Sequence, residues 1–321
     1  MLPEGRSHVR RFVLGMILSV LAASAAMAQT SSQASSQASA QVSSQASAEA
    51  SAQASAHTSA DTLAKVRETG RLVIGFREDA RPFSYRTEAG EPAGYSIDLC
   101  RRIATAVKDT LALDAIEIAF EPVPVGRRME MLTAGTIDIE CGSTTHTLER
   151  REQVDFTLLT FVTGAEMLTR VESEITGLDA LAGRTVGVLE ETTTERGLRA
   201  ALRTQMIDAT VETFDRHETG LAALEDGAID AYFADRILLL GLASEARDPS
   251  VLELSGQFYS YEPYAFMVRR GDHDFRRVAD GALAAMYRSG RIWNVYDDHF
   301  GGAEPSEMLV ALFILQGLPQ R

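Results

Sequence analysis

Cysteine is scarce in this sequence, since Cys100 and Cys141 are the only two among 321 residues. No Cys-x-x-Cys pair of the kind that binds zinc or exchanges disulfides can therefore form. Neither cysteine lies near the apolar segment at the N-terminus, so neither can carry a lipid at that place. In an oxidising compartment the two could pair and close a loop of about 40 residues, or both could stay buried thiols. The sequence leaves both possibilities open.

The sequence also lacks the short motifs of common enzyme classes. It contains no Gly-x-Ser-x-Gly elbow, no His-Glu-x-x-His zinc helix and no Walker loop. Positive charge is in the minority, with 31 Lys and Arg against 45 Asp and Glu and a net charge of −14. We therefore expect no catalytic residue, metal or cofactor, and no nucleic acid as a partner. An anionic ligand would have to be attracted by local arginines.

The first 28 residues are typical of a secretory signal peptide. Arginines precede an apolar run over residues 12–26, and the run ends in Ala26-Met27-Ala28. The run is short for a membrane span, so we expect cleavage after Ala28 and export to the periplasm. Residues 29–60 are almost wholly Ser, Ala and Gln. Such a segment cannot bury enough apolar surface to fold, and we expect a disordered spacer.

From residue 61 onward, predicted strands alternate with predicted helices in two successive sets. The first set begins with a buried strand at residues 71–77, and the second begins with a strand at residues 184–189. This alternation predicts an α/β protein with two lobes, each built on a mostly parallel sheet with helices on its faces.

The stretch from Ile137 to Arg150 combines a short strand with hydroxyl residues and an arginine. The strand ends at Gly142, Ser143 and Thr145 follow, and a helical turn carrying Arg150 is predicted next. Hydroxyls at a helix N-terminus favour an anion, and a planar guanidinium can hold a carboxylate through two parallel hydrogen bonds. The alternative is that the hydroxyls only cap the helix and Arg150 is solvated.

Further candidates follow the ends of other strands. Arg77 ends a buried strand, Thr192 lies at a second strand–hydroxyl–helix junction, Asp235 follows a strand and His217 precedes a helix. Ligands of open α/β sheets bind at the carboxyl ends of the strands. The alternatives are a structural salt bridge for Arg77, a helix cap for Asp235 and an ordinary loop position for His217.

Several segments together resemble the periplasmic amino-acid-binding proteins of ABC importers, which form solute-binding family 3. The likeness is closest to the glutamate/aspartate-binding type. The segments are Gly75–Arg77, Pro82–Tyr85, Gly94–Asp98 and Glu140–Arg150. The resemblance implies the type II fold, in which two lobes joined by a two-stranded hinge close around one amino acid. We expect lobe 1 at residues 61–163 and 263–300, lobe 2 at 164–262, and a C-terminal tail at 301–321.

The resemblance also implies a role for each candidate residue. The α-carboxylate of the ligand would be held by Ser143, Thr145, Arg150 and Thr192. The ammonium would be held by Asp235. A side-chain carboxylate would be held by Arg77, Arg128 and His217. Since Arg127 and Arg128 are adjacent on a predicted helix, only one of them should face the ligand, and the resemblance favours Arg128.

The expected function is therefore capture of L-glutamate or L-aspartate for an inner-membrane ABC permease, by a monomer. Val125 replaces a serine of the glutamate/aspartate type, so glutamine and asparagine stay open as ligands. His217, if its pKa were ordinary, would add a positive charge below about pH 6.5. A dehydratase on the same fold, similar to cyclohexadienyl dehydratase, needs only one placed acid and is the enzymatic alternative. A sensory ligand-binding module is a third possibility.

Overall fold

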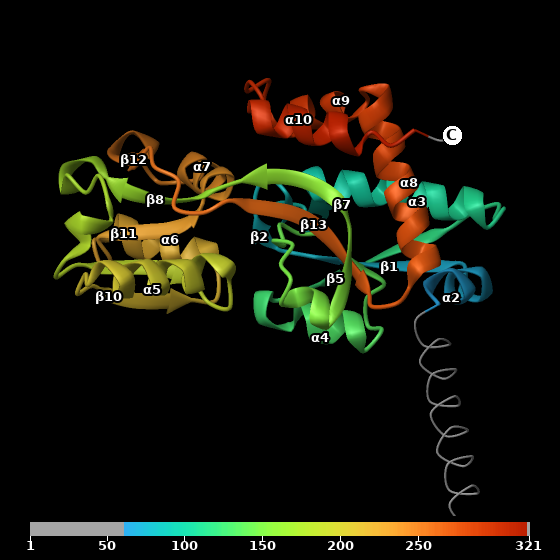
Figure 1. Cartoon of the computed structure of the whole chain (residues 1–321), viewed down its shortest axis with the longest axis horizontal. Helices are drawn as coiled ribbons and strands as arrows, with labels where there is room; N and C mark the ends of the chain where they lie inside the picture. Colours follow the sequence, from blue (N-terminus) through green and yellow to red (C-terminus); the bar gives the residue numbers. More distant parts are fainter. Residues whose placement is uncertain (1–60, 320–321) are drawn as a thin grey trace, which may run out of the picture. The chain divides into compact units, whose positions relative to one another are not determined.

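The computed structural model describes residues 61–319, which form two α/β lobes (Figure 1). The predicted signal peptide and spacer lie outside the described residues. Lobe 1 contains a sheet whose strands are, in spatial order, β5 (Glu117–Pro122), β1 (Arg71–Phe76), β6 (Ile139–Glu140), β13 (Glu262–Arg269) and β7 (Val154–Thr163). Lobe 2 contains a sheet ordered β10 (Thr210–Phe214), β9 (Thr185–Leu189), β11 (Ala231–Asp235), β8 (Ala165–Arg170) and β12 (Leu252–Leu254).

Each sheet mixes parallel and antiparallel strands. In lobe 1 the strands β5, β1 and β6 are parallel, and β13 runs antiparallel to both β6 and β7. In lobe 2 the strands β10, β9 and β11 are parallel, and β8 runs antiparallel to both β11 and β12. The α/β class is confirmed, but the sheets are less parallel than expected. The reason is that the chain crosses from lobe 1 to lobe 2 and back in opposite directions, which adds antiparallel pairs to both sheets.

Helices cover both faces of each sheet. Around the first sheet lie α2 (Thr62–Thr69), α3 (Tyr95–Thr110), α4 (Arg128–Thr133), α8 (His273–Ser289) and α9 (Ile292–Phe300). Around the second lie α5 (Thr193–Gln205), α6 (His217–Glu225) and α7 (Arg236–Ser244). The buried apolar residues accordingly form separate clusters on the two faces of each sheet. A small third sheet joins β2 (Asp79–Ala80), β3 (Ser84–Arg86) and β4 (Pro92–Ala93).

Two segments connect the lobes. In Figure 1, β7 continues through Gly164 into β8, and the chain returns between β12 and β13. A Cβ atom at Gly164 would lie only 2.5 Å from the Phe258 ring and 2.6 Å from the Ser260 carbonyl oxygen of the returning segment. The close approach of the two crossing segments therefore requires glycine at this position.

The stretch after β6 is held in place from lobe 1. Cys100 on α3 and Cys141 form a disulfide, so the structure decides between the two possibilities left open by the sequence. The Ser96 hydroxyl, also on α3, donates a 2.7 Å hydrogen bond to the Gly142 carbonyl oxygen. These two contacts fix the backbone immediately before Ser143.

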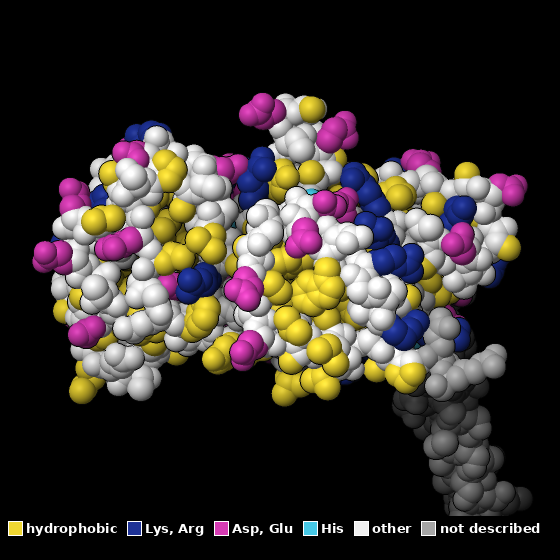
Figure 2. All heavy atoms as spheres, turned by 90° about the horizontal axis from the view of Figure 1, so that it is seen from above, with side chains coloured by type: hydrophobic (Ala, Val, Ile, Leu, Met, Phe, Trp, Pro, Cys, Tyr) yellow, Lys and Arg dark blue, Asp and Glu magenta, His cyan; other side chains and the backbone are white. Residues whose placement is uncertain are grey.

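The segment expected as a C-terminal tail contains α10 (Glu307–Gln316), which packs on lobe 1. The Phe313 ring stacks on Tyr287 of α8 with their centroids 4.8 Å apart. The outer side of α10 is apolar, because Ile314 and Leu315 are exposed. Figure 2 shows hydrophobic side chains gathered on this face of the molecule. Within residues 61–319, no helix is both long enough and apolar enough to cross a membrane.

Candidate functional site

All eight candidate ligand-binding residues line one cavity between the lobes. They are Arg77, Arg128, Ser143, Thr145 and Arg150 from lobe 1, and Thr192, His217 and Asp235 from lobe 2. The cavity has a volume of about 30 Å³. Typical small-molecule pockets measure roughly 300–1,000 Å³, so a ligand can enter only when the lobes move apart.

The hydroxyl residues after β6 do not lie at a helix N-terminus, so that part of the sequence prediction is wrong. The His146 N–H donates to the Pro263 carbonyl oxygen (2.7 Å), and the Ala265 N–H donates to the Thr144 carbonyl oxygen (3.1 Å). Thr145 also forms an isolated β-bridge with Tyr264. Because this backbone pairs with β13, helical structure begins only with the short 3-10 helix at Arg150–Glu152.

The second junction does have the expected geometry. Thr192 is the N-cap of α5, and its Oγ1 accepts a 3.0 Å hydrogen bond from the Glu195 N–H. Thr193, at the first turn of α5, approaches Thr145 of lobe 1, with 3.2 Å between the two hydroxyl oxygens. The helix N-terminus of lobe 2 therefore faces the hydroxyl segment of lobe 1 across the cavity.

Arg128 and Arg150 are buried without an ion pair. Arg150 donates to the Thr145 carbonyl oxygen at 2.6 Å, and Arg128 reaches the Glu191 carbonyl oxygen of lobe 2 at 3.5 Å. Within the described chain, neither guanidinium has a carboxylate oxygen within 4 Å, and the Arg128 Nε has no hydrogen-bond partner. Burial and the neighbouring Arg150 lower the pKa of Arg128 to about 9. Burial also lowers the pKa of Arg150.

Arg127 points away from the cavity, as the resemblance implied. Its side chain is 62% exposed and forms a 3.0 Å ion pair with Glu130 on the same helix turn. Arg128, by contrast, is only 6% exposed. Adjacent positions on a helix face different directions, and here the second arginine faces inward.

Arg77 differs from the other two arginines because it already has a counter-charge. Its Nη2 donates to the Asp79 Oδ1 at 2.7 Å, and both side chains are buried. The other Asp79 oxygen accepts the His217 backbone N–H of lobe 2 at 2.9 Å. Burial acts to raise the pKa of Asp79, but Arg77 and these other contacts outweigh it, so the pKa lies below its ordinary value.

His217 does not supply the positive charge expected in mild acid. Its Nδ1 lies 3.0 Å from the Tyr232 hydroxyl, and the ring is buried. Burial lowers the pKa of His217 to about 4, more than the nearby Asp79 can raise it. The imidazole is therefore neutral between pH 5 and 7, and the expectation based on its ordinary pKa is wrong.

The acidic residue that lines the cavity comes from lobe 2, and a second buried carboxylate lies close to it on the returning crossing segment. Asp235, at the end of β11, accepts hydrogen bonds from the Thr194 hydroxyl (3.1 Å) and from the Tyr264 hydroxyl. Glu262, at the start of β13, accepts the Thr193 hydroxyl at 2.8 Å. Burial and the nearby Glu262 raise the pKa of Asp235 to about 7.

A further carboxylate, Glu140, is buried beside the arginines. Neither of its oxygens has a hydrogen-bond partner among residues 61–319, and burial raises its pKa while Arg128 opposes the rise. A Cβ atom at Gly142 would lie too close to Oε1 of Glu140, so a larger residue there would displace the carboxylate.

Several of these residues were not identified from the sequence. They are Asp79, Glu140, Thr193, Thr194, Glu262 and Tyr264. Asp79 stands two residues after Arg77, and Glu140 and Thr193 lie inside or beside the hydroxyl-rich stretches. Their closeness in sequence to predicted site residues could therefore have identified them. Glu262 and Tyr264 come from β13, and their approach to the cavity depends on the return of the chain to lobe 1.

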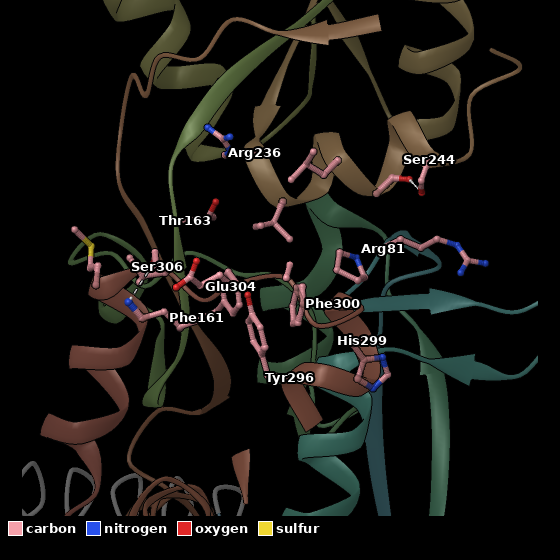
Figure 3. A pocket seen from close by; sticks show the side chains of 18 of the residues that line it. Arg81, Phe161, Thr163, Arg236, Ser244, Tyr296, His299, Phe300, Glu304 and Ser306 are labelled. Carbon is pink, nitrogen blue, oxygen red and sulfur yellow. Dashed lines mark hydrogen bonds between the residues drawn. The ribbon is translucent and has the colours of Figure 1, made fainter. Parts of the chain in front are cut away.

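A second and larger cavity, of about 810 Å³, lies between α7, the crossing segments and α9. Figure 3 shows aromatic side chains such as Phe161, Tyr296 and Phe300 within it. Both arginines at its edge already have partners, because Arg81 pairs with Glu245 and Arg236 lies 3.3 Å from Glu166. The carboxylates Asp298 and Glu304 also line it and form no ion pair among the described residues. Despite its size, this cavity therefore offers the carboxylates of an amino acid no unpaired arginine among its described lining residues.

Chemically, the small cavity presents two unpaired cations on one side and a carboxylate on the other. Among the described residues no group of three or more His, Cys, Asp and Glu side chains is arranged to hold a metal ion. The arrangement suits the recognition of a zwitterion that carries an additional negative charge.

Comparison with known proteins places this geometry in a family. Residues 72–302 match the model of the bacterial extracellular solute-binding proteins, family 3. The L-glutamate/L-aspartate-binding protein of Pseudomonas aeruginosa is 36% identical over 239 residues, which cover 74% of this chain and 79% of that protein. The glutamate/aspartate import solute-binding protein of Escherichia coli is 32% identical over 247 residues, covering 77% and 82% of the two chains.

Solved structures agree with these sequence relatives. The solute receptor for L-cysteine of Neisseria gonorrhoeae superposes with a TM-score of 0.68 at 26% identity, covering 77% of this chain and 98% of that one. The predicted type II periplasmic-binding fold is thereby confirmed.

Proposed function

Because the chain belongs to family 3 of the bacterial extracellular solute-binding proteins, we propose that it captures L-glutamate or L-aspartate for an ABC importer. The amino acid is held between the lobes and passed to an inner-membrane permease. The relatives named above are binding proteins for these two amino acids, and the likeness supports the same ligand class here. The protein works in the periplasm as a monomer, after export by a signal peptide within residues 1–28.

The charge pattern of the small cavity carries this proposal. Arg128 and Arg150 are buried cations without a carboxylate partner in the described chain, and Asp235 is a buried carboxylate on the opposite lobe. Buried charges that lack partners are costly. An amino acid with an acidic side chain brings two carboxylates and one ammonium, which matches two cations and one anion.

Arg150 holds the α-carboxylate in this proposal. The guanidinium is fixed by its hydrogen bond to the Thr145 carbonyl oxygen, and Ser143, Thr145 and Thr192 place hydroxyl groups around the same cavity. A carboxylate there would also lie near the N-terminus of α5, whose free N–H groups and dipole favour an anion.

Asp235 holds the ammonium group. The hydroxyls of Thr194 and Tyr264 each donate to one of its oxygens, which fixes the carboxylate at the cavity wall. An ammonium group close to Asp235 would favour the ionised form and lower its raised pKa.

Arg128 is the principal partner of the side-chain carboxylate. Arg77 and His217 line the same region, but Arg77 is paired with Asp79 and the His217 ring is neutral. Val125 is buried at the start of the 3-10 helix Val125–Arg127 and offers no hydrogen bond in place of the expected serine. The distal carboxylate therefore depends mainly on one guanidinium.

We also propose the lobe boundaries given by the sequence, with lobe 1 at residues 61–163 and 263–300 and lobe 2 at 164–262. Strands change from one sheet to the other at Gly164 and again before Glu262, which supports hinges at these two crossings. Closure about them would bring Arg150 and Asp235 to the same ligand.

The test is a thermal-shift series with each of the twenty amino acids. A ligand present at about 100 times its Kd stabilises the folded protein by about 2.7 kcal/mol, which corresponds to about 5–10 °C for a protein of this size. Glutamate and aspartate should give the largest shifts, and Arg150→Ala should remove them. Chromatography of the recovered ligand should find it chemically unchanged, since we propose binding without turnover. Equal shifts for all amino acids, or conversion of the ligand, would contradict the proposal.

A further inference from the structure

Asp79 places a carboxylate of the protein behind Arg77 and His217, which line the cavity at the side proposed for the ligand's side chain. It lies in β2 of lobe 1 and is buried. Both of its oxygens are used, one by the Arg77 guanidinium at 2.7 Å and the other by the His217 N–H at 2.9 Å. The second contact crosses between the lobes.

The contact with His217 completes the N-terminus of α6. The N-cap residue Arg216 makes no side-chain capping bond, so the first N–H of this nine-residue helix needs another acceptor. Asp79 supplies it from the opposite lobe, and a negative charge is favoured at a helix N-terminus. The carboxylate is therefore held in place by a cation and by a helix end together.

We infer that Asp79 is a positioning residue that acts through Arg77 and limits the preference of the site for an acidic side chain over its amide. This inference rests on the proposed function. Asp79 takes one edge of the Arg77 guanidinium and the free N–H of α6, two groups that would otherwise serve an anionic ligand. A ligand carboxylate that approaches Arg77 also approaches Asp79, and the like charges repel.

The expected effect of removing the charge of Asp79 follows from these contacts. In an Asp79→Asn variant, the Asn side-chain oxygen can still accept the His217 N–H, but Arg77 loses its counter-charge. A glutamate side chain could then supply that counter-charge, whereas a glutamine side chain could not. The acidic ligand should gain relative to the amide.

A weaker closure of the lobes in the variant would not affect the comparison between acidic and amide ligands. If Asp79→Asn weakens the contact between the lobes, it weakens closure for every ligand by the same factor. That factor cancels in the ratio of the glutamine Kd to the glutamate Kd. A merely structural role of Asp79 would lower both affinities and leave the ratio unchanged.

The experiment is calorimetry of the wild type, Asp79→Asn and a matched control with glutamate, aspartate, glutamine and asparagine. The control is Glu78→Gln, which removes one negative charge from the neighbouring residue. Like Asp79, Glu78 does not itself line the cavity, but it pairs with Arg86 at 2.6 Å and with Arg216 of lobe 2 at 4.0 Å rather than with Arg77. Asp79→Ser, which also keeps an acceptor atom, is the second variant if Asp79→Asn does not fold.

In Asp79→Asn the ratio of amide Kd to acid Kd should rise by about tenfold, equivalent to about 1.4 kcal/mol, and in Glu78→Gln it should stay within twofold. A rise of less than threefold in the Asp79 variants, or a fall, would overturn the inference while leaving the proposed function intact. A fall would mean that Asp79 instead orients Arg77 for the ligand. If the wild type binds none of the four amino acids, the proposed function itself fails, and the inference fails with it.

Discussion

Replacing Arg128 with methionine should separate ligand binding from protein stability. The guanidinium is buried, has no ion pair among residues 61–319 and leaves its Nε without a partner. Its pKa of about 9 reflects a cost of burial. A decrease of this size corresponds to about 4–5 kcal/mol against the charged form. Because arginine is charged at pH 7 in both folded and unfolded protein, that cost is fully present at neutral pH.

Methionine fills part of the same space without the charge. The unliganded Arg128→Met protein should therefore not unfold at a lower temperature than the wild type. We expect its unfolding temperature to rise by about 2 °C or more. Its affinity for glutamate should nevertheless fall by about 2–5 kcal/mol, the usual cost of removing one partner of a buried charge pair. Glutamine, which brings no second carboxylate, should lose less than about tenfold, or 1.4 kcal/mol.

The assay combines calorimetry with thermal unfolding, and the chain offers a matched control. Arg127→Met removes the same charge one residue earlier, from a side chain that is exposed and paired with Glu130. It should change neither glutamate binding nor the ratio of the two affinities. If Arg128→Met binds glutamate within twofold of the wild type, Arg128 does not hold the side-chain carboxylate, and the charge argument for an acidic ligand is refuted.

Four other predictions can be checked with the same preparations. Arg150→Lys should keep the fold but weaken every amino-acid ligand by about 2–5 kcal/mol, because lysine keeps the charge and loses the two-pronged geometry; calorimetry within twofold of wild type would exclude Arg150 as the α-carboxylate ligand. Since the pKa of Asp235 is about 7 without ligand and an ammonium group requires its ionised form, glutamate affinity should fall by about tenfold per pH unit below 7, with proton release detected by calorimetry in buffers of different ionisation enthalpy. Because the pKa of His217 is about 4, its imidazole stays neutral between pH 5 and 7 and should not offset this loss. A glutamate affinity that stays constant or increases as the pH falls from 7 to 5 would contradict the roles given to Asp235 and His217. Saturating glutamate should reduce the radius of gyration in small-angle scattering, because ligand binding closes the lobes about the two crossing segments; an unchanged radius would argue against closure. Reduction of the Cys100–Cys141 disulfide should lower the unfolding temperature, since a loop of this length contributes about 4 kcal/mol in the chain-entropy model, and a shift below about 2 °C would show that the bridge adds little.

The sequence predicted the two-lobed α/β architecture because its signals are local. Strand and helix patterns, the hydroxyl-rich junction at Thr192 and the family segments around Arg77 and Arg150 can all be read within short windows. Local spacing also gave a correct prediction for the adjacent residues Arg127 and Arg128. Helical geometry allows only one of them to face inward, and Arg128 is the buried one.

The features that could not be predicted from the sequence depend on contacts between segments far apart in the chain. The segment at Ser143–Thr145 was expected at a helix N-terminus, but pairing with β13, about 120 residues later, holds it extended. The charge balance around the cavity was also hidden, because the partner of Arg77 is Asp79 and Glu262 lies close to Asp235. Burial of His217, which removes its charge, likewise follows only from the packed structure.

A crystal structure of the complex with L-glutamate tests the central claim most directly. We predict the α-carboxylate at Arg150, the ammonium at Asp235 and the side-chain carboxylate at Arg128, each within about 3 Å of its partner. The Arg77–Asp79 pair should stay intact beside the ligand. Glutamate bound in the larger cavity behind α7, or bound between the lobes with its side-chain carboxylate away from Arg128, would contradict the account.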